Sequence, residues 1–313
     1  MTSAAEKFEG PEKKLEVILR KPLEGIRDHA DGRWHRVVKA CRAEIVSRIF
    51  TDQMDAYLLS ESSLFVWTDR ILMITCGRTM LTRAVPAILE IVGRENVALV
   101  FYERKNFMYP SEQPADFEQD VEDLASCFPG KSYRLGPANH DHVHVFYASQ
   151  AGLDATGDAT LQVLMHDLDP SLVAIFGRQN GGDVPSVRRR SGLMDVYPHM
   201  AVDGHLFSPY GFSINGIDDD RYYTIHVTPQ PDGSYASFET NIIEPDYGEI
   251  VRMITAIFKP GRFSTVLTTS IDGTCMPLHP KACRAQGGYA LTEKSLYEFD
   301  CGYAVSFINQ VRT

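Results

Sequence analysis

Residues Tyr57–Val66 read YLLSESSLFV and set a Glu61–Ser62 peptide bond inside an apolar run of β-strand character. A serine hydroxyl held beside a peptide carbonyl, in a strand whose neighbours cannot move, can attack that carbonyl instead of an external substrate. The alternative is that Ser62 and Ser63 form hydrogen bonds with neighbouring backbone in a half-buried strand. The stretch therefore suggests a self-cleavage site, with a purely structural serine pair as the competing interpretation.

A β-hairpin is predicted directly after this stretch. The runs Ser63–Trp67 and Ile71–Cys76 are both of β type and only three residues separate them, which indicates a tight turn. If the first two of those residues form the loop, Glu61 lies opposite Cys76, and a shift by one residue puts Ser63 there instead. Directly opposed residues have Cβ atoms about 5 Å apart. Both registers bring the Cys76 thiol beside the suspected scissile bond, and a buried structural cysteine is the alternative.

Composition and charge argue against a polyanionic partner. The chain has 313 residues and a formal net charge of −10, and its one basic run, Arg188–Arg190, is interpreted as a solvated loop. The six cysteines show no Cys-x-x-Cys spacing, which favours reduced thiols over disulfides or zinc. No apolar segment reaches membrane-spanning length, and the charged N-terminus has no signal-peptide core. We expect a cytoplasmic protein without nucleic-acid or membrane partners.

Periodicity predicts the other elements near the functional residues. Strands are expected over 15–19 and 97–102, and helices over about 79–92, 115–127 and 249–258. A further helix is expected from Asp158 to Leu168, and Asp158 itself would be its N-cap. His140, His142 and His144 are expected on one face of a strand, and a metal site is rejected because no fourth ligand is apparent.

The strand-and-helix pattern of the first half recurs in the second half, and no low-complexity linker separates the two. This pattern favours two sheets packed face to face, each covered outside by helices. We therefore expect an α+β fold, a four-layer αββα sandwich of two mainly antiparallel sheets that arose by internal duplication. The chain, 1–313, would form a single domain with pseudo-repeat halves at about 1–150 and 151–313.

A second hairpin is predicted between residues 206–216 and 222–229, with its turn at Asp218–Asp220. With a four-residue loop from Asp218 to Arg221, Ser213 falls opposite His226. A serine and a histidine paired in this way form a proton-transfer couple if both face inward. The alternative is a histidine whose hydrogen bonds are satisfied within the sheet.

Several segments together resemble the eukaryotic-type S-adenosylmethionine decarboxylases, which depend on a pyruvoyl group. The matching segments are FEGPEKKLE at 8–16, LSESS at 59–63, TCG at 75–77, and RKNFMYPS at 104–111, to which we assign a structural role. The resemblance runs through nearly the whole chain and implies the αββα sandwich, with the active site in the sheet edge region. It also implies autocatalytic serinolysis between Glu61 and Ser62. That cleavage would give a β chain of residues 1–61, an α chain of residues 62–313 and a pyruvoyl cofactor made from Ser62, with no metal.

The resemblance further implies a reaction and residue roles. The pyruvoyl carbonyl would form a Schiff base with S-adenosylmethionine and accept the electrons released with carbon dioxide. The product, S-adenosylmethioninamine, is the aminopropyl donor for spermidine and spermine biosynthesis. The implied roles fall to Ser62 (pyruvoyl), Cys76 (proton donor), Glu9 and Glu12 (active-site acids), Ser213 and His226 (processing), and Phe8, Glu61, Phe207 and Gln230 (substrate binding). Phe8 and Phe207 would sandwich the adenine, and aromatic faces also suit a sulfonium. Without the resemblance, Phe8 would be a core aromatic and Glu9 and Glu12 the polar end of a strand.

The sequence departs from the family pattern at two places. Gln230 stands where the family has a glutamate that accepts hydrogen bonds from both ribose hydroxyls, and an amide has only one acceptor oxygen. Residues of the family's putrescine site are retained at Glu16, Asp158, Thr160 and Glu239, whereas Gln162 replaces an acid and Ile74 a basic residue. Weaker ribose binding or a changed substrate is therefore open, and activation by putrescine is doubtful.

Two other functions remain open. Gln230 favours a pyruvoyl decarboxylase of the same fold that acts on ornithine or arginine. A non-catalytic paralogue that activates a partner decarboxylase is disfavoured, because it would need none of Ser62, Cys76, Ser213 and His226. For the first-choice function the partner is the small molecule S-adenosylmethionine, the α and β chains stay together, and a homodimer is possible.

Overall fold

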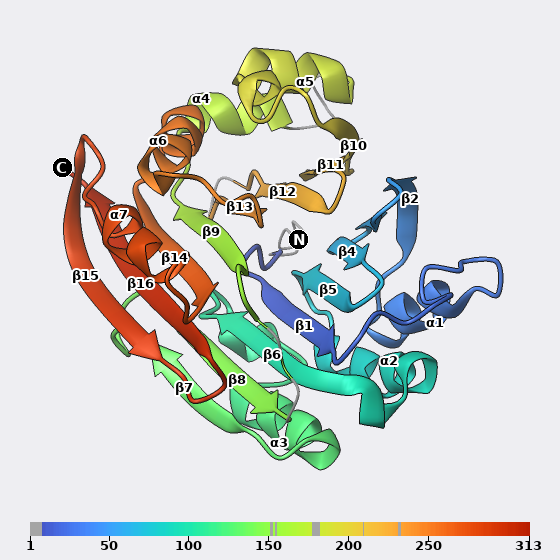
Figure 1. Cartoon of the computed structure of the whole chain (residues 1–313). Coiled ribbons are helices and arrows are strands. Elements are labelled where there is room, and N and C mark those ends of the chain that lie inside the picture. The colour runs from blue at the N-terminus through green and yellow to red at the C-terminus, as the bar shows by residue number, and fades with distance from the viewer. Residues whose placement is uncertain (1–7, 151–152, 154, 177–181, 209, 231–232) are drawn as a thin grey trace.

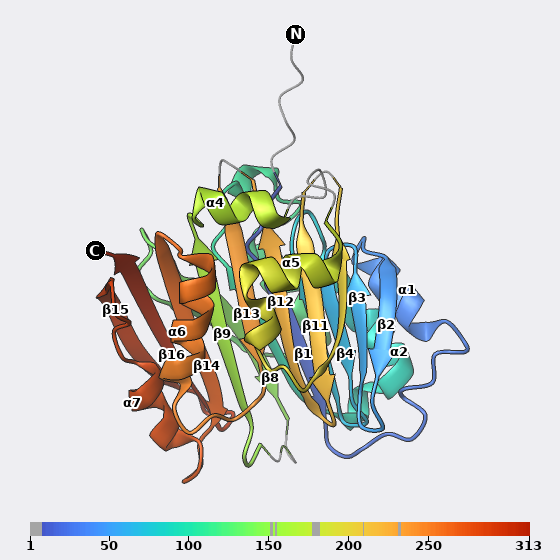
Figure 2. The same cartoon turned by 90° about the horizontal axis from the view of Figure 1, so that it is seen from above.

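In the computed structural model, the described residues (8–150, 153, 155–176, 182–208, 210–230 and 233–313) form two eight-stranded antiparallel sheets. The sheets pack face to face and the helices cover their outer faces (Figure 1). Viewed from above, α1 and α2 lie behind the sheets and α4, α5 and α6 in front of them (Figure 2). The predicted α+β, four-layer αββα sandwich is confirmed.

The first sheet has the strand order β2-β3-β4-β5-β1-β6-β8-β7. Its strands are β1 (Lys13–Leu19), β2 (Ile45–Phe50), β3 (Asp55–Leu59), β4 (Ser62–Val66), β5 (Arg70–Thr75), β6 (Val97–Lys105), β7 (Lys131–Leu135) and β8 (Val143–Ser149). Every neighbouring pair runs antiparallel. Strand β1 therefore lies near the centre of this sheet, between β5 and β6.

The second sheet repeats this order as β10-β11-β12-β13-β9-β14-β16-β15. Its strands are β9 (Ala159–His166), β10 (Ala201–Leu206), β11 (Phe212–Asp218), β12 (Arg221–Thr228), β13 (Tyr235–Thr240), β14 (Arg262–Ser270), β15 (Tyr289–Glu298) and β16 (Tyr303–Arg312). Each strand occupies the place of the strand numbered eight lower in the first sheet. We propose that the sheets arose by duplication, with halves at about 1–150 and 151–313 in one domain.

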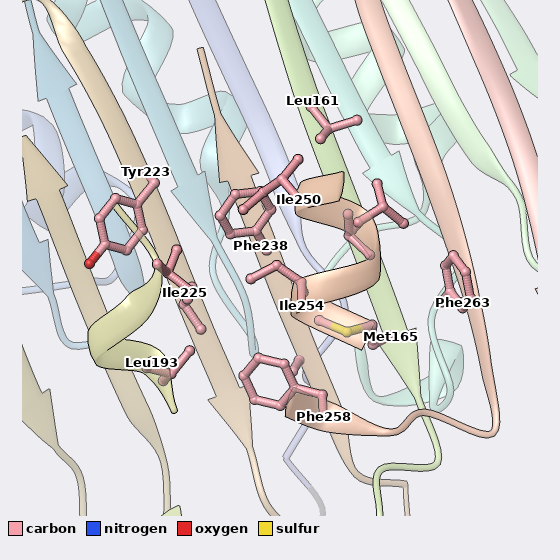
Figure 3. Packing of buried hydrophobic residues seen from close by; sticks show 14 of the residues in the cluster. Leu161, Met165, Leu193, Tyr223, Ile225, Phe238, Ile250, Ile254, Phe258 and Phe263 are labelled. Carbon is pink, nitrogen blue, oxygen red and sulfur yellow. The ribbon is translucent and has the colours of Figure 1, made fainter. Parts of the chain in front are cut away.

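Helices close the outer faces of both sheets. They are α1 (Arg33–Ala40), α2 (Ala84–Val92), α3 (Phe117–Cys127), α4 (Pro170–Val173), α5 (Val184–Ser191), α6 (Tyr247–Phe258) and α7 (His279–Ala282). Helix α6 shows why they pack: Ile250, Ile254 and Phe258 share one helical face and lie over Phe238 of β13 and Met165 of β9 (Figure 3). Burial of each such side chain contributes about 1.5–3 kcal/mol to the free energy of folding. Within the described residues, no helix is long and apolar enough to span a membrane.

Both hairpins have the predicted registers. In β4–β5 the backbone N–H of Trp67 donates to Arg70, so the loop has two residues and the first of the two predicted alignments is correct. In β11–β12, Ser213 pairs with His226 as predicted. The β11–β12 loop is shorter than expected because pairing continues to Asp218 and Arg221.

The predicted helix from Asp158 to Leu168 is wrong, because residues 159–166 form strand β9. All eight residues of β9 are buried, since one face meets the other sheet and the opposite face meets α6. Apolar and polar residues do alternate along β9, with Ala159, Leu161, Val163 and Met165 in the cluster under the helices, but Leu161, Leu164, Met165 and Leu168 also match the i, i+3, i+4 and i+7 spacing of a helix. Asp158 is consequently no helix N-cap.

Two smaller predictions are also wrong. Of the three histidines, only His144 lies in β8, and its ring packs 4.5 Å from that of Phe117. No group of three or more His, Cys, Asp or Glu side chains in the described part of the chain could hold a metal ion.

Arg188–Arg190 lies in helix α5 rather than in a loop. Arg189 and Arg190 are exposed on the last turn of this helix.

Candidate active site

A cavity of about 970 Å³ lies where strands and loops of both sheets converge. All of the predicted catalytic and substrate-binding residues except Glu12 line it: Phe8, Glu9, Glu61, Ser62, Cys76, Phe207, Ser213, His226 and Gln230. Ser62 begins β4 and Cys76 directly follows β5, both inside the first sheet. The site thus lies at the ends of strands, namely the start of β4 and the end of β5 in the first sheet and the end of β10, an edge strand, in the second.

The Glu61–Ser62 bond is held against Cys76. The Cys76 backbone N–H donates to the Glu61 carbonyl oxygen at 3.0 Å, and the Cys76 thiol donates to the same oxygen at 3.6 Å. The Ser62 hydroxyl in turn donates to Cys76 Sγ at 3.6 Å. Two donors on one carbonyl oxygen stabilise the negative charge that develops there when a nucleophile attacks.

The backbone at Ser62 is strained. Its φ angle is 125°, in a region that residues with a side chain rarely adopt. Such a conformation costs on the order of 1–3 kcal/mol and persists only where the surroundings hold it in place. Ser62 is buried between β3 and β5, so the strain is held at the bond that would break.

Burial raises the pKa of both acidic groups around this bond and so favours their protonated forms. The pKa of the Cys76 thiol is raised well above its usual value, first by burial and then by the neighbouring Glu61 carboxylate. Burial likewise raises the pKa of Glu61 to about 7, against the attraction of Lys13. Among the described residues, Glu61 Oε2 is buried without a hydrogen-bond partner. The thiol can therefore deliver a proton, and Glu61 has an oxygen available for a ligand.

A glycine lets Phe8 approach this group. Gly77 has a φ angle of 61°, and a Cβ there would lie 2.8 Å from Glu61 Oε2 and 3.1 Å from the Phe8 ring. Phe207 reaches the same cavity from the end of β10 in the other sheet. The two aromatic side chains therefore come to one cavity from different sheets.

Glu9 and Glu12 differ in their surroundings. Both Glu9 carboxylate oxygens accept backbone N–H groups, from Met108 at 2.8 Å and Tyr109 at 2.7 Å, so Glu9 anchors the 104–111 segment beside the cavity. Glu12 accepts from Ser237 at 2.7 Å and faces the space between the sheets instead. Burial raises the pKa of Glu12 to about 8. The structure does not bring Glu12 into the cavity lining.

Ser213 and His226 face inward as a hydrogen-bonded couple. His226 Nδ1 lies 2.8 Å from Ser213 Oγ. Burial lowers the pKa of His226 to about 3, so the imidazole is neutral at pH 7 and can act as a base. The pairing across β11 and β12 thus has the geometry of proton transfer.

Gln230 uses its acceptor within the protein. Its Oε1 accepts the backbone N–H of Phe8 at 3.2 Å, which leaves one lone pair of that oxygen and the amide NH₂ group available to a ligand. An amide in this position cannot accept from two ribose hydroxyls.

Three further polar residues adjoin the cavity lining through His226 and were not predicted as site residues. Ser63, Asn215 and Thr224 are buried behind Ser62 and contact one another or His226. The two-residue period of a strand puts Asn215 on the face of Ser213, and Thr224 on the face of His226. That alternation is the sequence signal that could have identified them.

The predicted putrescine-site remnant is a buried ion-pair network between the sheets. Arg70 lies 3.1 Å from Glu16 and 2.8 Å from Asp158, and Lys14 lies 3.2 Å from Glu239. The acids raise the pKa of Lys14 despite the burial that opposes its charge. Thr160 is buried in β9. The chain's own cations therefore neutralise these acids.

Little space is left in this network. The cavity lined by Glu12, Lys14, Ile74 and Glu239 measures about 10 Å³, the lower limit for a single water molecule. Gln162 Nε2 donates to Glu103 Oε2 at 2.6 Å beside it. A diamine does not fit there without displacing a side chain.

Comparison with known proteins agrees with this geometry. The model of the family described as adenosylmethionine decarboxylase matches residues 5–310. An S-adenosylmethionine decarboxylase proenzyme from Dictyostelium discoideum is 34% identical, and the alignment covers 96% of this chain and 85% of the relative. The proenzyme from Xenopus laevis is 35% identical, with 91% and 90% covered. A crystal structure of a Trypanosoma brucei AdoMetDC-delta26 monomer superposes with a TM-score of 0.64 at 27% identity, covering 80% of this chain and 99% of that one.

Proposed function

The chain belongs to the adenosylmethionine decarboxylase family, and from this premise we propose that it decarboxylates S-adenosylmethionine, for polyamine synthesis, with a pyruvoyl group made from its own Ser62. The observation that carries the proposal is the strained backbone of Ser62 next to the Glu61 carbonyl, whose oxygen accepts from both the N–H and the thiol of Cys76. An ordinary structural serine pair needs neither the strain nor the donors.

Self-cleavage proceeds in steps that the residues support. Ser62 Oγ attacks the Glu61 carbonyl carbon and the Ser62 nitrogen departs as an amine, which converts the peptide into an ester. A base then removes the Ser62 Cα proton, the C–H electrons form a Cα=Cβ double bond, and Oγ leaves as part of the Glu61 carboxylate. The resulting dehydroalanine tautomerises, adds water and loses ammonia to leave a pyruvoyl group. His226, which lines the same cavity as Ser62, is the neutral base in this scheme, and Ser213 is its hydrogen-bonded partner.

The cavity fits the pyruvoyl group and the substrate. A pyruvoyl group supplies a carbonyl that can bind the substrate amine and accept the electrons released with carbon dioxide. The protonated Cys76 thiol, 3.6 Å from Ser62 Oγ, is placed to return a proton to the substrate carbon. Phe8 and Phe207 offer aromatic faces for an adenine and a sulfonium, and the unpartnered Glu61 oxygen offers an acceptor.

The cleaved chains stay together by this proposal. The β chain, 1–61, supplies β1, β2 and β3, and β1 is paired on both sides, with β5 and β6 of the α chain. Removing β1 would break the centre of the first sheet. We propose a cytoplasmic enzyme that acts on a small molecule, and a homodimer of processed pairs stays a prediction.

The direct test measures both processing and substrate choice. Intact mass spectrometry of the purified protein should show two chains that end at Glu61 and begin at residue 62 with a pyruvoyl mass. Carbon dioxide release should then be measured with S-adenosylmethionine, ornithine and arginine. Turnover of ornithine or arginine but not of S-adenosylmethionine would replace the proposed substrate. An unprocessed chain that nevertheless stimulates a relative's decarboxylase would favour the activating paralogue.

A prediction for Gln230 follows from its single acceptor oxygen, Oε1, which already accepts the Phe8 N–H. Gln230→Glu should lower KM for S-adenosylmethionine by roughly tenfold with little change in kcat, because a charge-assisted hydrogen bond contributes about 1.5–3 kcal/mol. Steady-state carbon dioxide release measures this. An analogue without the two ribose hydroxyls is the control and should gain nothing from the substitution. An equal gain for that analogue would show that the new charge attracts the sulfonium rather than binding ribose.

A prediction for Lys14 follows from its burial opposite Glu239. Lys14→Leu should lower the free energy of unfolding by about 3–5 kcal/mol, since it leaves a buried carboxylate unpaired. Denaturant unfolding measures this loss, and Lys14→Arg, which keeps the charge, is the matched control. Added putrescine should leave the wild-type decarboxylation rate unchanged, because Lys14 and Arg70 already neutralise the acids. A putrescine-stimulated wild type would contradict this account of the network.

A further inference from the structure

The buried residues behind Ser62 form a hydrogen-bonded chain that ends on His226. Ser63 Oγ donates to Asn215 Oδ1 at 2.7 Å, and Thr224 Oγ1 lies 2.9 Å from the same oxygen. Thr224 Oγ1 is also 2.8 Å from His226 Nε2, on the side of the ring away from Ser213. Ser63, Asn215 and Thr224 come from β4, β11 and β12, so the chain crosses from one sheet to the other.

The orientation of the Asn215 amide is determined by its surroundings. Its Nδ2 donates to the backbone carbonyl of Tyr57 at 3.2 Å. The opposite orientation would face that carbonyl with a second acceptor, Oδ1, which is unfavourable in a buried position. Asn215 Oδ1 therefore points to Ser63 and Thr224, where it accepts from both hydroxyls with its two lone pairs.

Thr224 has one hydroxyl hydrogen, and two groups that can only accept compete with the histidine for it. Its one hydroxyl hydrogen has two pure acceptors within reach, Asn215 Oδ1 at 2.9 Å and the Ile214 carbonyl at 3.1 Å. Ser63 Oγ, 3.3 Å from the same ring nitrogen, spends its hydrogen on Asn215 as well. When the Thr224 hydrogen goes to Asn215 or Ile214, the 2.8 Å contact requires that His226 Nε2 carries a hydrogen and donates it to Thr224.

We propose that Thr224, oriented by Asn215, holds His226 in the tautomer protonated at Nε2, so that its basic Nδ1 faces Ser213 in the cavity that also contains the scissile bond. The inference rests on the proposed self-cleavage and names positioning residues for it. A neutral imidazole has one N–H, so the tautomer decides which nitrogen can take a proton. In the elimination step Nδ1 takes the Ser62 Cα proton, directly or through the Ser213 hydroxyl, as the Cβ–Oγ bond breaks.

The tautomer can be measured without any cleavage. Ser62→Ala, which cannot form the ester, should be labelled with ¹⁵N-histidine, and the His226 ring signals assigned by their loss in Ser62→Ala/His226→Gln. The expected spectrum has the hydrogen on Nε2 and a bare Nδ1. Adding Thr224→Val should mix the two tautomers, whereas Thr224→Ser should preserve Nε2–H. A hydrogen on Nδ1 in the Thr224-containing protein would overturn the proposal.

Processing kinetics test the consequence. In the otherwise wild-type chain, Thr224→Val should slow elimination on the order of 10²-fold, so that the ester accumulates. This factor is the lower end of the rate enhancement that a positioned base usually contributes. Hydroxylamine cleaves esters but not peptides, and would split the accumulated form between residues 61 and 62. Thr224→Ser should process at nearly the wild-type rate. Fast processing in Thr224→Val with an unchanged tautomer would also overturn the proposal, whereas a wild-type chain that never cleaves would refute self-cleavage and leave the tautomer measurement valid.

Discussion

Ser62→Ala should remain one chain of 313 residues, whereas the wild type separates into residues 1–61 and 62–313. The methyl side chain has no nucleophile, while the Glu61 carbonyl keeps its contacts with Cys76. Without the serine oxygen no ester forms, and without the ester no leaving group exists for elimination. Intact mass spectrometry decides the outcome, and decarboxylation should be absent in the variant because no pyruvoyl group arises.

A nearby serine provides the matched control. Ser60 lies two residues upstream, lines the same cavity and accepts the Glu44 backbone N–H at 3.0 Å. Ser60→Ala should cleave at the same bond as the wild type, since its hydroxyl is not adjacent to the scissile carbonyl. If Ser62→Ala still splits after Glu61, another protease cuts the chain, and the pyruvoyl proposal loses its basis.

The hairpins could be predicted because a short loop leaves few registers. Once the turn after Trp67 is located, a two-residue loop puts Glu61 opposite Cys76 without any knowledge of the rest of the fold. The same logic puts Ser213 opposite His226 even though the loop is shorter than expected, since adding one pair at the end of a hairpin does not shift its register. The central part of the site could therefore be predicted from the registers of two local hairpins.

Strand β9 was mistaken for a helix because Leu161, Leu164, Met165 and Leu168 match a helical spacing, although apolar and polar residues alternate along the strand. The other errors concern features that depend on both sheets. Asp158 pairs with Arg70, and Glu12 with Ser237, across wide separations in sequence. The same holds for Ser63, whose partner Asn215 lies in the other sheet. Only the face-to-face packing of the sheets brings these groups together.

Cys76→Ala should separate the two chemical stages. The variant should still cleave, at a lower rate, because the Cys76 backbone N–H keeps donating to the Glu61 carbonyl oxygen at 3.0 Å after the thiol donor is lost. Its decarboxylation rate should fall by about 10²–10⁴-fold, the usual contribution of a positioned acid. Burial raises the pKa of this thiol well above its usual value, so the wild type should not lose its proton donor as the pH rises through 7 and 8. Processing is read by mass, and turnover by carbon dioxide release from the fully processed protein.

The expected separation distinguishes a proton donor from a structural thiol. Cys76→Ser, which keeps a weaker acid of similar size, should process normally and retain more turnover than the alanine variant. A structural cysteine predicts instead that both variants lose thermal stability and that turnover, once corrected for folded protein, is unchanged. If Cys76→Ala stays a single chain, the 3.6 Å thiol contact with the Glu61 oxygen is essential for ester formation, and Cys76 acts before the pyruvoyl group exists rather than after.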